Sequence, residues 1–191
     1  AIGCAVAYFL SKRGATPIVI ERHEVAGQAS GKSGGFLALD WCRGTALDRL
    51  ARRSFALHAE LAQELGNPWG YRTLTTFAGH APGKPGKAPR PWLSDRVTLT
   101  GQIGSPETTA IVEPRSFTQG LLKASGAELK IGTVVGLARD QKGVVLESGE
   151  TVAGDAVVIA MGPWTVLAAR WLPMPAVYGH KGQDRKSTRL N

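Results

Sequence analysis

The feature that most constrains this chain is a short apolar run ending in an acid, Ile18-Val19-Ile20-Glu21, followed by a loop of small residues and hydroxyls at 27–35. The β-branched side chains of residues 17–21 are typical of a buried parallel strand. In dinucleotide-binding folds, an acid at the tip of the second strand accepts hydrogen bonds from ribose hydroxyls. A glycine and serine loop can bring backbone N–H groups against a pyrophosphate. The two elements predict a dinucleotide ligand, and the loop favours FAD over NAD.

Gly3 opens an alanine-rich segment with helical spacing at 3–12, and Glu21 follows it by eighteen residues. In the fingerprint G-x-G-x-x-G, the third glycine lets the helix pack closely on the strand, and the acid follows about 20 residues later. We interpret Gly3 as that third glycine and expect the first strand and two glycines to precede Ala1. The alternative is an ordinary glycine at a helix start. Arg22 could pair with a 2′-phosphate, but the adjacent acid repels that group, which disfavours NADP.

The loop at 29–35 reads Ala-Ser-Gly-Lys-Ser-Gly-Gly. Small residues permit close approach to an anion, and Ser30 and Ser33 can donate hydrogen bonds to it. A flexible linker is the alternative interpretation. Because the loop lies between a predicted strand and a predicted helix, we favour a shaped loop.

A second apolar run, at 156–160, is the strongest signal for a buried strand and leads into Met161-Gly162-Pro163-Trp164. A glycine after a buried strand allows the backbone to lie against a ligand. Trp164 could cover a flat ring, or it could be a core tryptophan beside a turn.

Hydrophobic spacing and turn residues predict the remaining elements. They are helices at 40–66 and 115–124, the second opened by Ser116, strands at 71–77, 97–103, 129–138 and 144–147, an exposed loop at 80–91, and turns at 140–143 and 148–150. This order indicates an α/β cofactor domain with an insertion.

Composition excludes several classes of protein. The 191 residues are 43% hydrophobic and 20% charged, as in globular proteins, and no apolar run reaches the roughly 20 residues that span a membrane. The net charge of +8 comes with no interleaved aromatics, so we predict no nucleic-acid partner. Two cysteines and four scattered histidines lack ligand spacing, which predicts no metal and reduced thiols. We expect an intracellular, cytoplasmic protein, with an organelle left open.

The pattern resembles the D-amino-acid oxidase (DAO) family of FAD-dependent oxidoreductases, and most nearly those of plants and fungi. Four pieces carry the resemblance: Gly3-Cys4-Ala5, Val19-Ile20-Glu21, the loop at 29–35, and Ala160-Met161-Gly162-Pro163-Trp164. The resemblance covers residues 3–183. It implies a Rossmann-like, three-layer FAD-binding domain with an inserted, β-rich and incomplete part of a substrate domain.

The resemblance also implies which residues bind FAD. The implied contacts are Gly3 at the helix start, Glu21 and the adjacent Arg22 at the adenosine ribose, Ala29 and Ser30 at the pyrophosphate, the backbone of Gly34, Gly35 and Phe36 at the flavin, the backbone of Val134 at the adenine, and Gly162 after the late strand. Residues 178–183 look like the start of the main sheet of the substrate domain.

Five segments follow from this interpretation. They are an FAD-domain part at 1–70, an inserted substrate-domain segment at 71–111, a return to the FAD domain at 112–172, the start of the substrate domain at 173–183, and a tail at 184–191 that we expect to be foreign. The tail resembles translated adapter sequence.

The resemblance implies an enzyme that oxidises the C–N bond of an amine or amino acid by hydride transfer to FAD. No catalytic residue is identified, and the substrate, electron acceptor and oligomeric state are not predicted. Two alternatives stay open: an NAD(P)-dependent Rossmann dehydrogenase, and a non-catalytic protein of this fold that acts in trafficking. We expect the chain by itself to be inactive and to bind FAD weakly or not at all.

Overall fold

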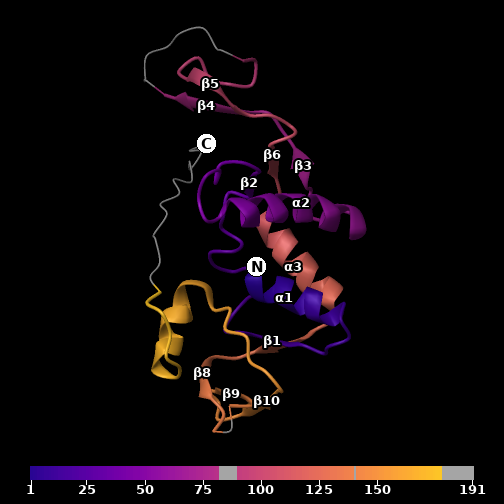
Figure 1. Cartoon of the computed structure of the whole chain (residues 1–191), viewed down its shortest axis with the longest axis vertical. Coiled ribbons are helices and arrows are strands. Elements are labelled where there is room, and N and C mark those ends of the chain that lie inside the picture. The colour runs from indigo at the N-terminus through magenta and orange to yellow at the C-terminus, as the bar shows by residue number, and fades with distance from the viewer. Residues whose placement is uncertain (82–89, 140, 178–191) are drawn as a thin grey trace, which may run out of the picture. The chain divides into compact units, whose positions relative to one another are not determined.

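This computed structural model describes residues 1–81, 90–139 and 141–177. The chain forms two compact units, and most of their helices and strands are labelled in Figure 1. The central unit consists of Val25–Gly126 with Ala1, and the terminal unit consists of Ile2–Glu24 with Ala127–Asn191.

The terminal unit begins with the predicted helix and strand. Helix α1 (Ile2–Ser11) ends before Gly14, whose φ of +83° suits a helix stop. Strand β1 (Ile18–Glu21) pairs in parallel with β7 (Glu128–Ile131), so that Glu21 lies opposite Ile131. The predicted helix at 3–12 and the parallel strand at 17–21 are confirmed within one residue at each end. The strand is only half-buried.

A second, antiparallel sheet of the terminal unit contains β8 (Val134–Leu137), β9 (Gly143–Leu146) and β10 (Thr151–Ala153), in the order β10-β9-β8. Its buried residues form a small hydrophobic cluster, which consists of Val144, Leu146 and Val152. The predicted turn at 148–150 joins β9 to β10 and is confirmed.

The prediction of one strand at 129–138 is wrong, because the chain changes partners in its middle. The N–H of Gly132 still donates to the carbonyl of Glu21 in β1, whereas the carbonyl of Thr133 accepts from the N–H of Glu147. β7 and β8 therefore belong to different sheets.

The predicted strand at 156–160 is also wrong. This segment forms no strand and belongs to no sheet, and Val158 is 57% exposed. An apolar run indicates burial, yet a strand also needs a neighbouring edge that is free to pair. The segment leads instead into a 3-10 helix, η1 (Gly162–Arg170), which the sequence did not predict.

Strands of the central unit form two antiparallel sheets. β2 (Phe36–Ala38), β6 (Thr109–Ile111) and β3 (Arg72–Thr73) make one sheet in the order β2-β6-β3. β4 (Thr76–His80) and β5 (Thr98–Gly104) make the other. The predicted strand that became β5 is confirmed. The single strand expected at the positions of β3 and β4 is wrong, because these two short strands pair with different partners.

The described residues of the central unit also form two α-helices, α2 (Asp48–Glu64) and α3 (Pro114–Ser125). The helix predicted at 40–66 begins eight residues too early, because 40–47 forms turns around Gly44, whose φ is +78°. The helix predicted at 115–124 is confirmed, but Ser116 does not cap it; the carboxylate of Glu113 does. Trp69 and Leu121 are the largest fully buried apolar side chains of this unit.

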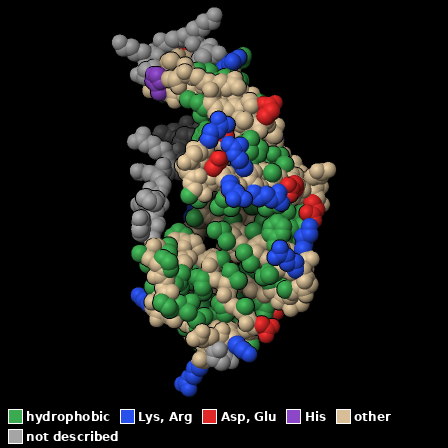
Figure 2. Space-filling model, viewed as in Figure 1, with side chains coloured by type: hydrophobic (Ala, Val, Ile, Leu, Met, Phe, Trp, Pro, Cys, Tyr) green, Lys and Arg blue, Asp and Glu red, His purple; other side chains and the backbone are tan. Residues whose placement is uncertain are grey.

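Part of the predicted loop at 80–91, the turn position Asp140, the expected strand at 178–183 and the tail at 184–191 lie outside the described residues. Among the described helices none is long and apolar enough to cross a membrane. Figure 2 shows hydrophobic side chains reaching the surface at many places on the face viewed, in keeping with the 73% exposure of Ile2 and the 69% exposure of Trp92.

Candidate cofactor site

Glu21 lies at the carboxyl end of β1, the end at which parallel sheets bind their ligands. One carboxylate oxygen, Oε1, accepts a hydrogen bond of 3.0 Å from the backbone N–H of His23. Among the described residues the other oxygen has neither a hydrogen-bond nor an ion-pair partner. A half-buried carboxylate with a free oxygen can accept hydrogen bonds from the adjacent hydroxyls of a ribose.

Gly3 lies in the first turn of α1, against the segment at 156–160 of the same unit. A Cβ built on Gly3 would lie 3.4 Å from the Cβ of Ala160, an ordinary van der Waals contact, so the helix and the segment lie close together at this point. In a dinucleotide fingerprint the third glycine brings the helix close to a strand, whereas the segment beside Gly3 forms no strand, so the role of Gly3 in a fingerprint stays a prediction.

Val134 and Gly162 also belong to the terminal unit. Val134 is the first residue of β8, pairs with Leu146, and stands at an irregularity in the register before Gly136. Gly162 begins η1 with a φ of +57° and is exposed, with open space where a Cβ would be. An L-residue would be strained there, which explains the glycine without a ligand.

Arg22 lies directly after β1, and its guanidinium carbon stands 5.0 Å from the centre of the Trp164 ring in η1. Sequence reasoning considered Trp164 only as a cover for a flat ring or as a core residue. The contact with Arg22 depends on how η1 folds back toward β1, and no local signal could reveal it.

The loop after β1 is shaped by its own backbone, within the central unit. Ala26 has a φ of +61°, and the N–H groups of Gly31 and Lys32 both donate to the carbonyl of Gln28. A Cβ on Gly31 would lie 2.0 Å from the carbonyl oxygen of Ala26, so only glycine fits. The loop is therefore a folded turn.

Two predicted pyrophosphate contacts lie in this turn. Ala29 is exposed, whereas the hydroxyl of Ser30 is half-buried and accepts a hydrogen bond of 2.7 Å from the amino group of Ala1.

Gly34, Gly35 and Phe36 end the loop and differ in their surroundings. Gly34 is exposed, with open space around a would-be Cβ, as a close backbone contact with a ligand requires. Gly35 is buried, has a φ of +70°, and packs against the carbonyl of Val112. Phe36 stacks on Trp41, which the sequence did not single out, with ring centres 4.9 Å apart.

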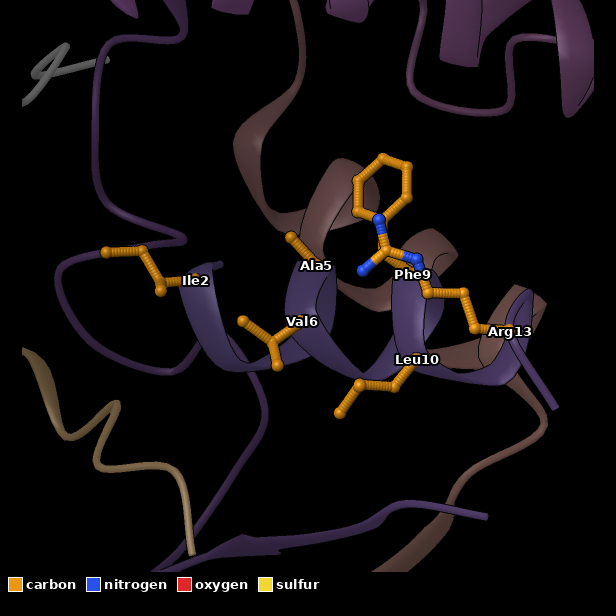
Figure 3. A pocket seen from close by; sticks show the side chains of 6 residues that line it. All are labelled: Ile2, Ala5, Val6, Phe9, Leu10 and Arg13. Carbon is orange, nitrogen blue, oxygen red and sulfur yellow. The ribbon is translucent and has the colours of Figure 1, made fainter. Parts of the chain in front are cut away.

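An apolar hollow lies on the outer face of α1 (Figure 3). It is lined by Ile2, Ala5, Val6, Phe9, Leu10 and Arg13. Among the described residues that line the hollow, Arg13 is the one charged group. Because a dinucleotide needs several polar contacts, we do not assign the cofactor to this hollow.

The predicted site residues thus fall into two groups. Gly3, Glu21, Arg22, Val134 and Gly162 belong to the terminal unit, where Glu21 and Arg22 are adjacent. The other group belongs to the central unit, within one loop and the strand that follows it; it consists of Ala29, Ser30, Gly34, Gly35 and Phe36. Among the described residues no group of three or more His, Cys, Asp or Glu side chains could hold a metal.

Comparison with known proteins identifies the family. Residues 1–183 match the family model of the FAD-dependent oxidoreductases named DAO. "Putative oxidoreductase C1F5.03c" of Schizosaccharomyces pombe is 26% identical over 181 positions, which cover 78% of this chain and 47% of that protein. "Putative oxidoreductase TDA3" of Saccharomyces cerevisiae is 42% identical over 85 positions, which cover 40% of this chain and 16% of that protein.

Solved structures agree with this match. Glycine oxidase from Bacillus cereus superposes with a TM-score of 0.73 and 24% identity, covering 88% of this chain and 56% of that one. Glycine oxidase from Geobacillus kaustophilus gives a TM-score of 0.65 and 26% identity, covering 88% and 55%. L-Amino acid deaminase from Proteus myxofaciens gives a TM-score of 0.63 and 20% identity, covering 85% and 43%.

The chain belongs to the DAO family of FAD-dependent oxidoreductases. It carries the Rossmann-like α/β fold of that family, as predicted. FAD, expected from the sequence, is the cofactor of the family, and this favours the flavin interpretation over a nicotinamide-dependent dehydrogenase. The chain spans about half the length of the first of these curated relatives and of the two glycine oxidases.

Proposed function

We propose that the complete protein oxidises the C–N bond of a small amine or amino acid with FAD as the acceptor. Family membership supports a flavin oxidoreductase, and two of the similar structures are named for glycine and for L-amino acids. The observation that carries the proposal is the carboxylate of Glu21, held at the carboxyl end of a parallel strand with one oxygen that has no partner among the described residues.

In the terminal unit, the residues present suit the adenosine end of FAD. Glu21 would accept hydrogen bonds from the ribose hydroxyls, and Arg22 would place a positive charge beside it. Gly3 would keep α1 close to the segment at 156–160. The N-terminus of α1 would offer its free backbone N–H groups to a phosphate. We propose the backbone of Val134 as the adenine contact and Gly162 as a close backbone contact.

In the central unit, we propose Ala29 and Ser30 at the pyrophosphate and Gly34, Gly35 and Phe36 near the flavin. The exposed backbone of Gly34 suits such a contact best, because nothing surrounds the position of its missing Cβ. For Gly35, packing against Val112 already explains the glycine, so its proposed contact with FAD rests on its place in the loop.

When bound, FAD would supply the hydride acceptor that lets the C–N bond of the amine become C=N, with the proton of the nitrogen passing to solvent. The protein residues named above would bind and orient the cofactor, and they would lower the cost of burying its phosphates by supplying hydrogen bonds. The domain boundaries given from the sequence, an intracellular location and the absence of a nucleic-acid partner remain part of the proposal.

Binding of FAD is tested in the full-length protein by titrating the apoprotein and following flavin fluorescence. Glu21→Gln replaces a charged acceptor by a neutral amide, so we expect the dissociation constant for FAD to rise about tenfold. Glu147→Gln, an exposed carboxylate of the same unit, is the matched control and should leave it unchanged. Equal affinities in the parent and Glu21→Gln would contradict the assignment of Glu21 to the ribose.

Turnover is tested by supplying glycine, sarcosine and other amines to the holoprotein and measuring bleaching of the flavin absorbance without oxygen. Bleaching by any of them supports the proposal, and its rate ranks the substrates. A folded protein that retains FAD but is bleached by none would favour the non-catalytic alternative.

A further inference from the structure

The contact between Arg22 and Trp164 fixes a cation beside the proposed ribose site. Trp164 stands in the first turn of η1, and its backbone N–H donates 3.2 Å to the carbonyl of Met161. Its ring lies beneath the guanidinium of Arg22, 5.0 Å from ring centre to guanidinium carbon. Both side chains are half-buried and belong to the terminal unit. Partial desolvation strengthens such a cation–π contact.

While the guanidinium of Arg22 lies over Trp164, it forms no ion pair with Glu21, the residue before it. Arg22 directly follows Glu21, and a guanidinium is well suited to pair with a carboxylate through two hydrogen bonds. Yet within the described part of the chain no ion pair joins Arg22 to any carboxylate, and Glu21 bonds only to the backbone of His23. The cation therefore rests on an indole while a carboxylate beside it keeps a free oxygen.

We propose that Trp164 is a positioning residue for the ribose site. By holding the guanidinium of Arg22 over its ring, it keeps that cation off the carboxylate of Glu21, which stays available to the ribose hydroxyls. If the indole is removed, Arg22 can turn toward Glu21 and compete with the ribose for its oxygens. This inference rests on the proposed function, because it assigns Glu21 to the FAD ribose.

The first test is a double-mutant cycle on FAD affinity in the full-length protein. Trp164→Leu should weaken FAD binding about fivefold, and Trp164→Phe, which keeps an aromatic face, should weaken it less. In the background of Arg22→Gln there is no cation to release, so Trp164→Leu should then have no effect. An equal loss in both backgrounds would mean that the indole acts through packing alone and would overturn the proposal.

A second readout needs no FAD. Protons of the Arg22 side chain that lie over an indole are shifted upfield in the NMR spectrum by the ring current. We expect this shift in the parent and in Glu21→Gln, and its loss in Trp164→Leu. Unshifted Arg22 protons in the parent would overturn the proposal even if Trp164→Leu failed to fold.

The two proposals fail differently. If Glu21→Gln weakens FAD binding and Trp164→Leu does not, the role of Trp164 is wrong and the ribose assignment stands. If neither variant changes the affinity while the Arg22 protons are shifted, the contact exists but Glu21 does not bind the ribose, and both assignments fall.

Discussion

The carboxylate of Glu113 caps helix α3 by accepting a hydrogen bond of 2.5 Å from the backbone N–H of Ser116. Its other oxygen accepts from the N–H of Arg115 at 3.1 Å. The first N–H groups of a helix have no partner within the helix, so one side chain satisfies two of them here. Hydrogen bonding by the Ser116 side chain, and after it by the backbone N–H groups of Ser116 and Arg115, lowers the pKa of the Glu113 carboxyl below its ordinary value.

Removing this cap should destabilise the central unit. We expect Glu113→Ala to lower the free energy of unfolding by about 1 kcal/mol in urea titrations at pH 7. Glu113→Gln keeps an acceptor and should lose less. Because the folded pKa is depressed, the charge of Glu113 contributes stability above the unfolded pKa, and this contribution disappears as pH falls through the folded pKa. The difference between parent and Glu113→Gln should therefore shrink in acid; a constant difference would contradict the charge effect.

Gly34 and Gly35 are adjacent, yet they should respond differently to the same substitution. A Cβ on Gly35 would lie 2.0 Å from the carbonyl oxygen of Val112, and its φ of +70° is strained for alanine. We expect Gly35→Ala to cost about 2 kcal/mol or more in the free energy of unfolding. Gly34→Ala meets nothing within 4 Å, so its stability should match that of the parent within about 0.5 kcal/mol.

Gly34→Ala also distinguishes an effect on FAD binding from an effect on folding. If the backbone of Gly34 approaches the flavin as proposed, Gly34→Ala should weaken FAD binding in the full-length protein while leaving the unfolding midpoint unchanged. If Gly34→Ala changes neither the affinity for FAD nor the stability, Gly34 does not belong to the proposed site.

Local signals account for what the sequence predicted correctly. The helical spacing in α1 and the β-branched run of β1 each lie within a few residues, so local preference and final structure agree. The position of the acid at the end of β1 is also a local signal, and its role at the ribose stays a prediction. The capping role of Glu113 was missed because glutamate is not among the favoured N-cap residues.

Elements whose form depends on a partner could not be predicted. Residues 156–160 have strand-like composition, but whether they pair depends on a free edge elsewhere in the fold. The sequence pattern of β3 and β4 predicts one strand, because no local signal shows that the two strands pair in different sheets. The stacking of Arg22 on Trp164 likewise joins positions far apart in the sequence, so only the three-dimensional structure shows it.

The buried hydroxyl of Thr109 forms hydrogen bonds with Leu74 and Thr76 in the central unit. Thr109 is fully buried, and its Oγ1 donates to the carbonyl of Leu74 at 2.6 Å and accepts from Thr76 Oγ1 at 3.1 Å. Thr109→Val keeps the shape but leaves the carbonyl and the second hydroxyl without this partner. We expect a loss of about 1–3 kcal/mol in the free energy of unfolding. Thr109→Ser keeps the hydroxyl and should lose less stability than Thr109→Val. If Thr109→Ser is instead the less stable variant, the methyl group contributes more to stability than the hydroxyl.

His58 should make the stability of the central unit depend on pH. Its ring stacks on Phe117 with centres 4.6 Å apart, and its Nδ1 is buried with no hydrogen-bond partner among the described residues. Burial lowers the pKa of the His58 imidazole below its ordinary value of 6.5. The unfolded chain therefore binds the proton first, so stability is full above about pH 6.5 and declines as pH falls below it.

Replacing the imidazole of His58 should reduce the loss of stability in acid. We expect the free energy of unfolding of His58→Phe to fall less between pH 7 and pH 5 than that of the parent. His23→Gln changes an exposed histidine and should follow the parent curve. Chemical denaturation at several pH values measures all three proteins. Parallel curves for the parent and His58→Phe would show that His58 takes up its proton as readily in the folded state as in the unfolded chain.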